Sequence, residues 1–265
     1  MNVTEEREKR FQRKPLTGLE LSFVIPVFFN QTNADVLTEL LREYEMYDPE
    51  LMRKIQFVIV DDCSPVKITI PEDIRLNYTL LRITTDISWN QAGARNLGVV
   101  KAACPKLVLT DCDHLFPEGL LQKIVGSAFP HKLYKFKRVD AEGKKKNSAC
   151  NIFYTSKAVF FTTLGYDEEF CGYYGYEDVM FREFQRRMGN KLRYFTRRIP
   201  IVSTDIDRDH SYHSLVRDTS RNLELMNRKL ALLKGEHPFD AHSRLFLNFD
   251  FETVAEHLLD SGESR

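Results

Sequence analysis

The sequence has no excess of charge of either sign. Its 265 residues include 38 Lys and Arg and 38 Asp and Glu, so the formal net charge is zero. A nucleic-acid-binding protein concentrates Lys and Arg on one face to neutralise phosphates, so this balance argues against a nucleic acid as partner. Because 43% of the residues are hydrophobic, the chain can bury a full core, which excludes global disorder.

Long hydrophobic runs and closely paired cysteines are also missing. No run of about 18 apolar residues occurs and the N-terminal segment is charged, so neither a membrane-spanning helix nor a signal peptide is predicted. The five cysteines are widely spaced and form no C-x-x-C pair, which argues against a disulfide framework and against structural zinc. We therefore expect a cytoplasmic protein.

Strand-length apolar runs alternate with helical stretches in the first half of the chain. The runs show almost no polar alternation, as is typical of strands buried on both faces of a parallel sheet. They are residues 21–27, 55–60, 79–83 and 107–110. Helices are predicted at 34–47 with Asn33 as N-cap, at 90–103, and from Pro117. This order predicts an α/β fold with a mostly parallel central sheet flanked by helices.

The second half has a different composition. The stretch 132–146 holds seven Lys and Arg against two acids; we expect a solvated loop, with contact to an acidic or lipid-diphosphate acceptor as the alternative. Aromatic residues crowd 153–176, and helices are predicted at 177–188, ended by Gly189, and around 220–233. No linker separates independent domains.

We therefore expect one domain at 19–235 with a smaller mixed second half. Its nucleotide-binding half is 19–115 and its acceptor-binding and catalytic half is 116–235. A charged extension, 1–18, precedes it. An acidic tail, 236–265, follows and packs on the body through LFLNFDF.

Polar or turn-forming residues follow three of the predicted strands, where ligands bind in open parallel sheets. Pro26 and Phe28 end the first. Asp61 and Asp62 end the second, and a carboxylate there selects a base that presents an N–H, such as uracil; the alternative is an Asx turn. Asp111-Cys112-Asp113 follows the fourth. Two carboxylates two residues apart on an extended segment face one site, which suits Mg²⁺ or Mn²⁺; the alternative is a solvated turn.

Three further segments carry candidate groups. Asn90 to Gly98 opens a helix whose N-terminus and Arg95 suit a diphosphate or a base, or simply tight helix packing. The segment 164–178 combines Tyr173, Tyr174 and Tyr176, as platforms for sugar rings, with Glu177 and Asp178; the alternative is core packing and a helix dipole. Late in the chain, His210 and His213 are candidate metal ligands or structural residues.

In order, these motifs resemble the inverting nucleotide-sugar glycosyltransferases of the GT-A fold, especially family 2 and the related galactosyltransferase C-terminal region. The matching segments are SFVIPVFFN, FVIVDDCS, NQAGARNLG, LTDCDH and LGYDEEFCGYYGYEDVMF. The resemblance departs at Cys63, where a glycine is usual, and at Val179 and Met180, where acids often follow.

The resemblance implies a GT-A fold and a role for each group. Asp61 or Asp62 contacts the base, Arg95 lies near the nucleotide, and Asp111 contacts ribose or sugar. Asp113 binds Mn²⁺ or Mg²⁺, with His210 or His213 as a further ligand. Asp178 is the general base and Glu177 grips hydroxyls. These donor-site residues are completed by Pro26, Phe28 and Asn90, and the acceptor site by Tyr173, Tyr174 and Tyr176.

We therefore expect an enzyme that moves a hexose or N-acetylhexosamine from a UDP-sugar to a glycan or glycoconjugate hydroxyl. It would be cytoplasmic, or peripheral at a membrane that carries the acceptor. A sugar nucleotidyltransferase is the nearest alternative, but a glycine-rich basic loop would ordinarily follow its first strand, where this chain has Val27-Phe28-Phe29-Asn30. A non-catalytic nucleotide- or glycan-binding module is the other.

Overall fold

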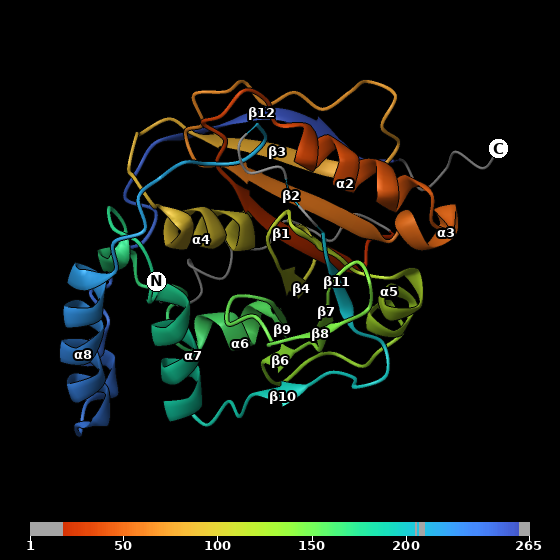
Figure 1. Ribbon diagram of the computed structural model, residues 1–265. Coiled ribbons are helices and arrows are strands. Elements are labelled where there is room, and N and C mark those ends of the chain that lie inside the picture. Colours follow the sequence, from red (N-terminus) through yellow and green to blue (C-terminus); the bar gives the residue numbers. More distant parts are fainter. Residues whose placement is uncertain (1–17, 205, 207–209, 260–265) are drawn as a thin grey trace, which may run out of the picture.

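An eight-stranded sheet forms the centre of the protein (Figure 1). The computed structural model describes residues 18–204, 206 and 210–259. The strand order is β10-β6-β9-β4-β1-β2-β3-β12. In that order the strands are Arg193–Tyr194, Tyr134–Lys135, Phe153–Ser156, Lys106–Leu109, Leu21–Val27, Ile55–Asp61, Asn77–Ile83 and Phe251–His257. The four strands predicted from apolar runs are β1, β2, β3 and β4, and they lie side by side in the middle.

These four central strands are parallel, as predicted. β1 pairs with β2 from Leu21 opposite Ile55 to Val27 opposite Asp61, and it pairs with β4 on its other side. Every residue of β1 and β2 is buried. The predicted bounds differ by at most two residues, since β3 begins at Asn77 and β4 at Lys106. Both sheet faces are therefore covered, which explains why the apolar runs lack alternation.

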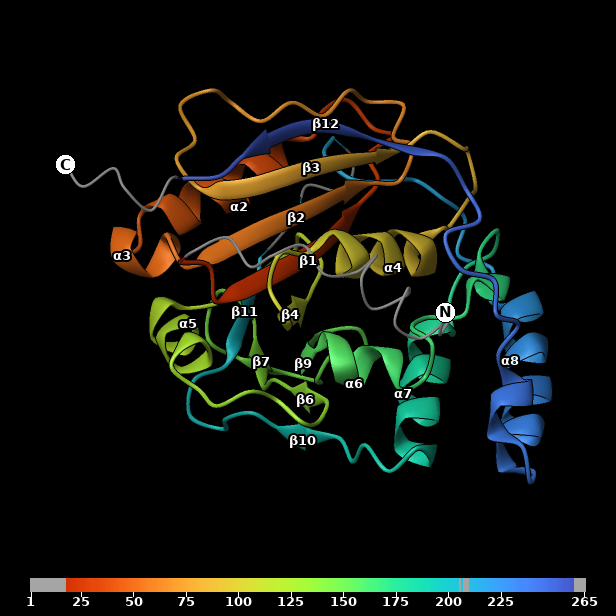
Figure 2. The same cartoon turned by 180° about the vertical axis from the view of Figure 1, so that it is seen from behind.

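Alternate residues of the central strands point to two different cores. Phe23 packs with Tyr44 of α2 (Asp35–Glu45) and with α5 (Glu118–Val125) on one face. Val24 packs with Leu97 of α4 (Gln91–Lys101) on the other face, together with α6 (Lys157–Phe161) and α7 (Glu177–Arg187). Figures 1 and 2 show α2 and α4 on opposite sides of the sheet. α8 (Ser220–Lys234) packs beside α7.

Three predicted helix starts are shifted by one residue, including that of α4, which begins at Gln91 and not at Asn90. The N-cap of α2 is Ala34 and not Asn33, although the Asn33 side chain still accepts a hydrogen bond of 3.0 Å from the Asp35 N–H. Pro117 is the N-cap of α5 and not its first helical residue. The short α3 (Pro49–Met52) was not predicted, nor were the 3₁₀ turns Glu168–Phe170 and Pro238–Ala241.

The basic stretch 132–146 is not the solvated loop that its composition predicts. It forms β6 of the main sheet and β7 (Arg138–Val139) and β8 (Lys145–Lys146) of a second, four-stranded sheet of order β5-β11-β7-β8. The other two strands are β5 (His114–Leu115) and β11 (Ile201–Ser203). Strand partners far away in the sequence, such as Ile201 opposite Arg138, supply the pairing.

The C-terminal segment adds β12 to the edge of the main sheet, antiparallel to β3. Sequence reasoning predicted no strand here. Of the LFLNFDF residues, Leu247, Phe249 and Phe251 pack against the core that contains α4. Within the described part of the chain, no helix combines the length and the apolar character needed to cross a membrane.

Candidate active site

A pocket of about 370 Å³ opens at the carboxyl ends of the central strands. It is lined by Pro26 near the end of β1, Phe28 after β1, Asp62 after β2 and Asp111 after β4. Residues 174–179 around the start of α7 and residues 212–219 close the other sides. The segments that carry the predicted motifs therefore converge on this single cavity, as open parallel sheets require.

Arg95 of α4 forms ion pairs with two acids that line the pocket, Asp111 and Asp178. Its side chain has no exposed surface, its Nη2 lies 2.7 Å from Asp111 Oδ1, and its Nη1 pairs with Asp178 Oδ1. Burial lowers the pKa of Arg95, but the negative charges of Asp178 and Asp111 raise it. The pKa of Arg95 therefore lies well above its usual value. A guanidinium presents donors in a fixed fork, so it sets the separation of two carboxylates that come from different elements.

This burial corrects the expectation that Arg95 itself contacts the nucleotide. A side chain without exposed surface cannot stack on a base or reach a diphosphate. Its contacts make it a positioning residue for Asp111 and Asp178.

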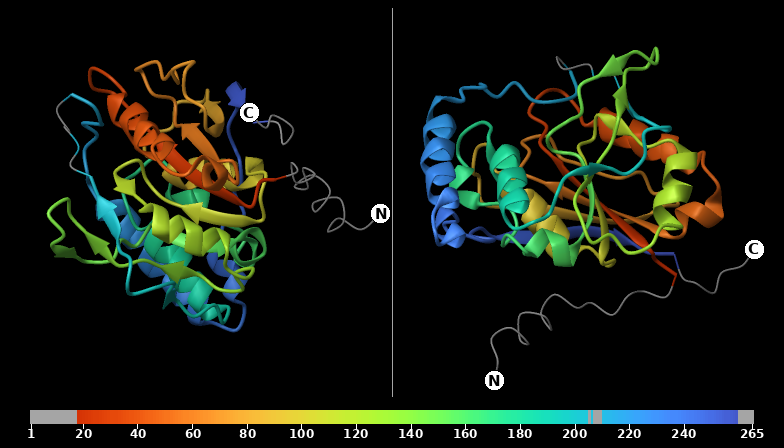
Figure 3. Two further views of the ribbon diagram at one scale, coloured as in Figure 1. Left: turned by 90° about the vertical axis from the view of Figure 1, so that its right-hand side faces the viewer. Right: turned by 90° about the horizontal axis from the view of Figure 1, so that it is seen from below.

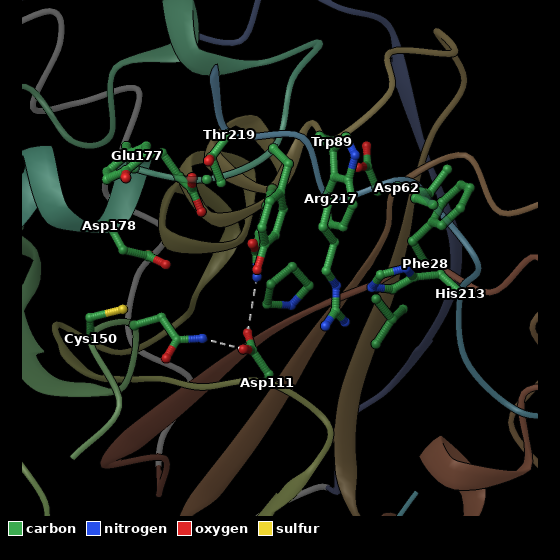
Figure 4. Close-up of a pocket in the computed structure, with 18 of the residues that line it drawn as sticks. Phe28, Asp62, Trp89, Asp111, Cys150, Glu177, Asp178, His213, Arg217 and Thr219 are labelled. Carbon is green, nitrogen blue, oxygen red and sulfur yellow. Dashed lines mark hydrogen bonds between the residues drawn. The ribbon is translucent and has the colours of Figure 1, made fainter. Parts of the chain in front are cut away.

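Asp111 is held by two further side chains that sequence reasoning did not assign. Gln91 Nε2 donates to Asp111 Oδ1 over 3.3 Å, and Asn151 Nδ2 donates to Oδ2. Figure 4 shows these bonds as dashed lines that end on Asp111 at the floor of the pocket. Burial raises the pKa of Asp111, while Arg95 acts in the opposite direction. Gln91 stands inside the NQAGARNLG motif, whereas no sequence signal marks Asn151.

Glu177 and Asp178 open α7 and both line the pocket. Tyr176 precedes them with φ +71° and Gly175 with φ +88°, so the chain turns sharply before the helix begins. Burial and the neighbouring Asp178 raise the pKa of Glu177 to about 8. Glu177 is thus mainly protonated at neutral pH, while Asp178 forms the ion pair with Arg95. The two adjacent acids therefore differ in chemistry.

The structure distinguishes Asp62 from Asp61. Asp61 pairs with Arg82 and accepts a hydrogen bond of 2.9 Å from the Ser64 N–H, so it has the turn-forming role. Asp62 lines the pocket. One of its oxygens accepts from the Asn90 N–H over 3.1 Å, and the other has no hydrogen-bond partner among the described residues. Burial raises the pKa of Asp62 to about 7.

Aromatic rings form one wall of the pocket. Trp89 lies 4.6 Å from Tyr174 and 4.9 Å from His213 between ring centroids. Trp89 Nε1 donates to the Val216 carbonyl over 3.1 Å, which ties the 212–219 segment to the start of α4. Arg217 extends into the centre of the cavity in Figure 4, with its Cζ 5.8 Å from the Tyr174 ring. Trp89 and Arg217 were not assigned from the sequence.

Some predicted site residues lie outside the cavity lining. Tyr173 is 47% exposed, and the Arg221 Cζ lies 3.9 Å from its ring centroid. Tyr174 and Tyr176, in contrast, line the pocket. His210 is exposed and is not part of the lining, whereas His213 is. Asp61, Asn90, Arg95 and Asp113 are also not part of the lining.

Asp113 occupies a turn and not the extended segment on which the sequence argument relied. Its Oδ1 lies 2.5 Å from His114 Nδ1, and its side chain is 21% exposed. Among residues 18–204, 206 and 210–259, no group of three His, Cys, Asp or Glu is placed to hold a metal ion. One carboxylate completed by phosphate oxygens is a donor set that suits Mg²⁺ and Mn²⁺.

No protein-family model and no curated protein matches the sequence. Solved structures do match. S. aureus TarS 1–349 in complex with UDP-GlcNAc matches with a TM-score of 0.60 at 14% identity, over 84% of this chain and 69% of that chain. The same TarS segment with UDP gives 0.54 at 16%, over 84% and 68%. Mannosyltransferase PcManGT from Pyrobaculum calidifontis, in complex with GDP-Man and Mn²⁺, gives 0.52 at 16%, over 90% and 75%.

The chain shares the fold of these proteins. This finding confirms the predicted α/β class, a mixed central sheet flanked by helices, as in GT-A glycosyltransferases. The neighbours were solved with a UDP-sugar, with UDP and with a GDP-sugar and Mn²⁺. The likeness is one of fold.

Proposed function

We propose that this protein is an inverting, metal-dependent glycosyltransferase that moves a hexose or N-acetylhexosamine from a UDP-sugar to a hydroxyl of a glycan or glycoconjugate. The observation that carries the proposal is the Asp111–Arg95–Asp178 chain in a pocket at the strand ends. It holds the carboxylates of Asp111 and Asp178 at a fixed separation, which supports one carboxylate for the donor and one for the acceptor. The nucleotide-sugar ligands of the structural neighbours support the same conclusion.

The donor half of the pocket suits a uracil nucleotide. Asp62 lines the cavity, and its Oδ1 is a buried atom without a hydrogen-bond partner among the described residues. An ionised carboxylate only accepts hydrogen bonds, so this oxygen favours a base with an N–H, such as uracil, over cytosine with its acceptor nitrogen. Phe28 offers an apolar surface nearby (Figure 4). Asp111, at the floor, is then the group that contacts ribose or sugar.

Asp178 is the proposed general base. As the acceptor oxygen attacks C1 of the donor sugar, its proton passes to Asp178, the C1–oxygen bond to the diphosphate breaks, and the nucleoside diphosphate leaves. A single displacement of this kind inverts the configuration at C1. Arg95 keeps the Asp178 carboxylate aimed at the pocket. Glu177, protonated at neutral pH, donates its O–H to a hydroxyl oxygen of donor or acceptor.

Asp113 is the residue that would hold Mn²⁺ or Mg²⁺, together with oxygens of the donor's diphosphate. His213, the histidine that lines the pocket, would be the further ligand. A bound divalent ion supplies Lewis-acid neutralisation of charge on the leaving diphosphate.

The decisive experiment screens UDP-, GDP- and CDP-sugars for hydrolysis in the presence of Mn²⁺, followed by transfer to simple sugar acceptors. Wild-type protein should hydrolyse a UDP-sugar. Asp178→Asn should bind UDP normally but lose about 10²- to 10⁴-fold in turnover, the usual contribution of a general base. Asp240→Asn, which changes an exposed carboxylate that is not part of the pocket lining, serves as control and should retain full turnover.

Near-normal turnover in Asp178→Asn would refute the assignment of the base. Synthesis of a UDP-sugar from UTP and a sugar 1-phosphate would instead identify a nucleotidyltransferase. Metal-dependent UDP binding without hydrolysis or transfer of any donor would identify a binding module.

A further inference from the structure

In two segments of the described chain, Lys and Arg greatly outnumber Asp and Glu. Residues 132–146 contain seven Lys and Arg against two acids, and residues 191–198 contain four against none. The strands β6 and β10 bring the segments together, with Arg193 opposite Tyr134 and Tyr194 opposite Lys135. A chain of zero net charge thus has one strongly cationic surface, which we call the basic face: Lys135, Lys137, Lys144, Lys145, Lys146 and Arg197.

Tyr194 lies at the centre of the basic face. Its ring is contacted by Lys135 Nζ at 4.4 Å, Lys137 Nζ at 4.6 Å and Arg197 Cζ at 5.4 Å. Three cations around one ring repel each other, and the ring stabilises each of them only modestly. A bound anionic group relieves that repulsion. The arrangement is therefore typical of a surface that binds anions.

The lysines of the basic face have no acidic partners within the described ranges. None of the ion pairs found there involves a residue of 132–146 or 191–198. Of the two acids in the stretch, Asp140 is buried and accepts the Lys144 N–H over 2.7 Å in the hairpin turn. Lys144, Lys145 and Lys146 are all exposed. Their charge is thus available to a ligand.

The basic face leads into the pocket. The β7–β8 hairpin projects from the body in both views of Figure 3, and the chain that leaves β8 reaches Cys150 and Asn151, which line the cavity. Cys150 is four positions after Lys146, so their Cα atoms lie within about 14 Å of each other. Cys150 lies beside Asp178 in Figure 4. Ser148, which lies in the segment between β8 and Cys150, connects this segment to the basic face through a 2.9 Å hydrogen bond with Tyr194.

We propose that the basic face binds a polyanionic acceptor, a glycan chain that carries phosphate, sulfate or carboxylate groups, and leads its terminal hydroxyl along Cys150 to Asp178. The assignment names the acceptor class for the glycosyl transfer proposed above and rests on it. A soluble polyanion fits better than a lipid surface, because the exposed large apolar side chains of the described residues all lie outside 132–146 and 191–198. Proteins that dock at an anionic membrane usually insert such side chains beside their cations.

The test uses labelled dextran sulfate as the polyanionic glycan and neutral dextran of the same length as its control, with binding followed by fluorescence anisotropy. Wild-type protein should bind dextran sulfate with an affinity that falls steeply with salt and should not bind dextran. The double variant K145E/K146E should bind about tenfold more weakly at low salt, and its log–log salt slope should be shallower by about 1.4. The matched double variant K67E/K234E reverses two exposed lysines elsewhere and should bind like wild type.

The path into the pocket has its own measurement. Alkylation of the exposed Cys150 by iodoacetamide, followed by mass spectrometry, should slow several-fold in wild-type protein saturated with dextran sulfate, but not with dextran. Binding without protection of Cys150 would overturn the proposed path. Equal binding by K145E/K146E and wild type would overturn the assignment of the basic face.

Two further readouts separate this proposal from its alternatives. Sedimentation with phosphatidylglycerol vesicles, in the absence of any binding to dextran sulfate, would identify a membrane-docking surface and overturn the proposal. Hydrolysis of the UDP-sugar needs no acceptor, so K145E/K146E should retain it. If wild type neither hydrolyses nor transfers any donor, the proposed function fails; if hydrolysis or transfer occurs but dextran sulfate does not bind, the acceptor class alone fails.

Discussion

Replacing Arg95 with methionine removes the buried cation that joins Asp111 to Asp178. The side chains of the two acids are 15% and 12% exposed, so neither carboxylate can recover its charge balance from water. Breaking a buried ion pair by removing one partner costs about 3–5 kcal/mol, because the remaining charge stays buried without compensation. For a domain of this size that corresponds to a fall of about 10 °C in melting temperature.

Urea unfolding at pH 7 and at pH 5 measures this effect. The loss should be smaller at pH 5, because the unpaired carboxylates of Arg95→Met take up protons there. The double variant R95M/D178N should recover part of the loss, since it removes one of the two stranded charges. Arg186→Met is the matched control: its pair with Glu183 is 72% exposed on the arginine side, and such pairs contribute about 1 kcal/mol or less.

A loss below about 1 kcal/mol for Arg95→Met, equal to that of the exposed control, would refute the reasoning. So would a double variant that is less stable than either single variant. Either result would mean that Arg95 does not set the separation of Asp111 and Asp178.

Three other predictions concern acids of the site. Asp62, whose pKa burial raises to about 7, gains charge as the pH rises, so the preference for UDP over CDP in calorimetry should increase from pH 6 to pH 8 in wild type and stay flat in Asp62→Asn. Burial is the main cause that raises the pKa of Glu177 to about 8, so the folded state keeps the Glu177 proton to a higher pH than the unfolded state does. The contribution of Glu177 to stability should therefore fall as the pH rises from about 4.5 to 8. Glu177→Gln should flatten that dependence in urea unfolding. Asp113→Asn should abolish the increase in UDP affinity produced by Mn²⁺ while metal-free binding stays as in wild type; an unchanged Mn²⁺ effect would remove Asp113 from the metal site.

The part of the site that local patterns predict is the part carried by strand ends and helix starts. Asp62 and Asp111 follow buried apolar runs, and Glu177 and Asp178 precede a helical period, so their approximate place could be read before the fold was known. Which of Asp61 and Asp62 lines the pocket could not be predicted, because it depends on Arg82, which lies opposite Asp61 in the β2–β3 register. Register is a property of two strands and not of either alone.

The role of Arg95 illustrates the same limit. Its position near the start of a helix suggested contact with a ligand, whereas its neighbours Asp111 and Asp178 occupy the positions that bury it. Asn151 and Arg217 carried no recognisable motif, and they reach the pocket only because distant strands and the 212–219 segment fold against it. Short strands such as β7 and β8 form because partners elsewhere in the chain pair with them.

The amino-acid sequence by itself determined the central strands, the main helices and the chemical types gathered at the strand ends, because these follow from the spacing of apolar and polar residues over a few turns or pleats. Only the tertiary structure decided which acids share a cation, which histidine faces the cavity and how lysines of 132–146 meet Tyr194 and Arg197. Each of these depends on contacts between residues dozens of positions apart, and local periodicity carries no information about such contacts.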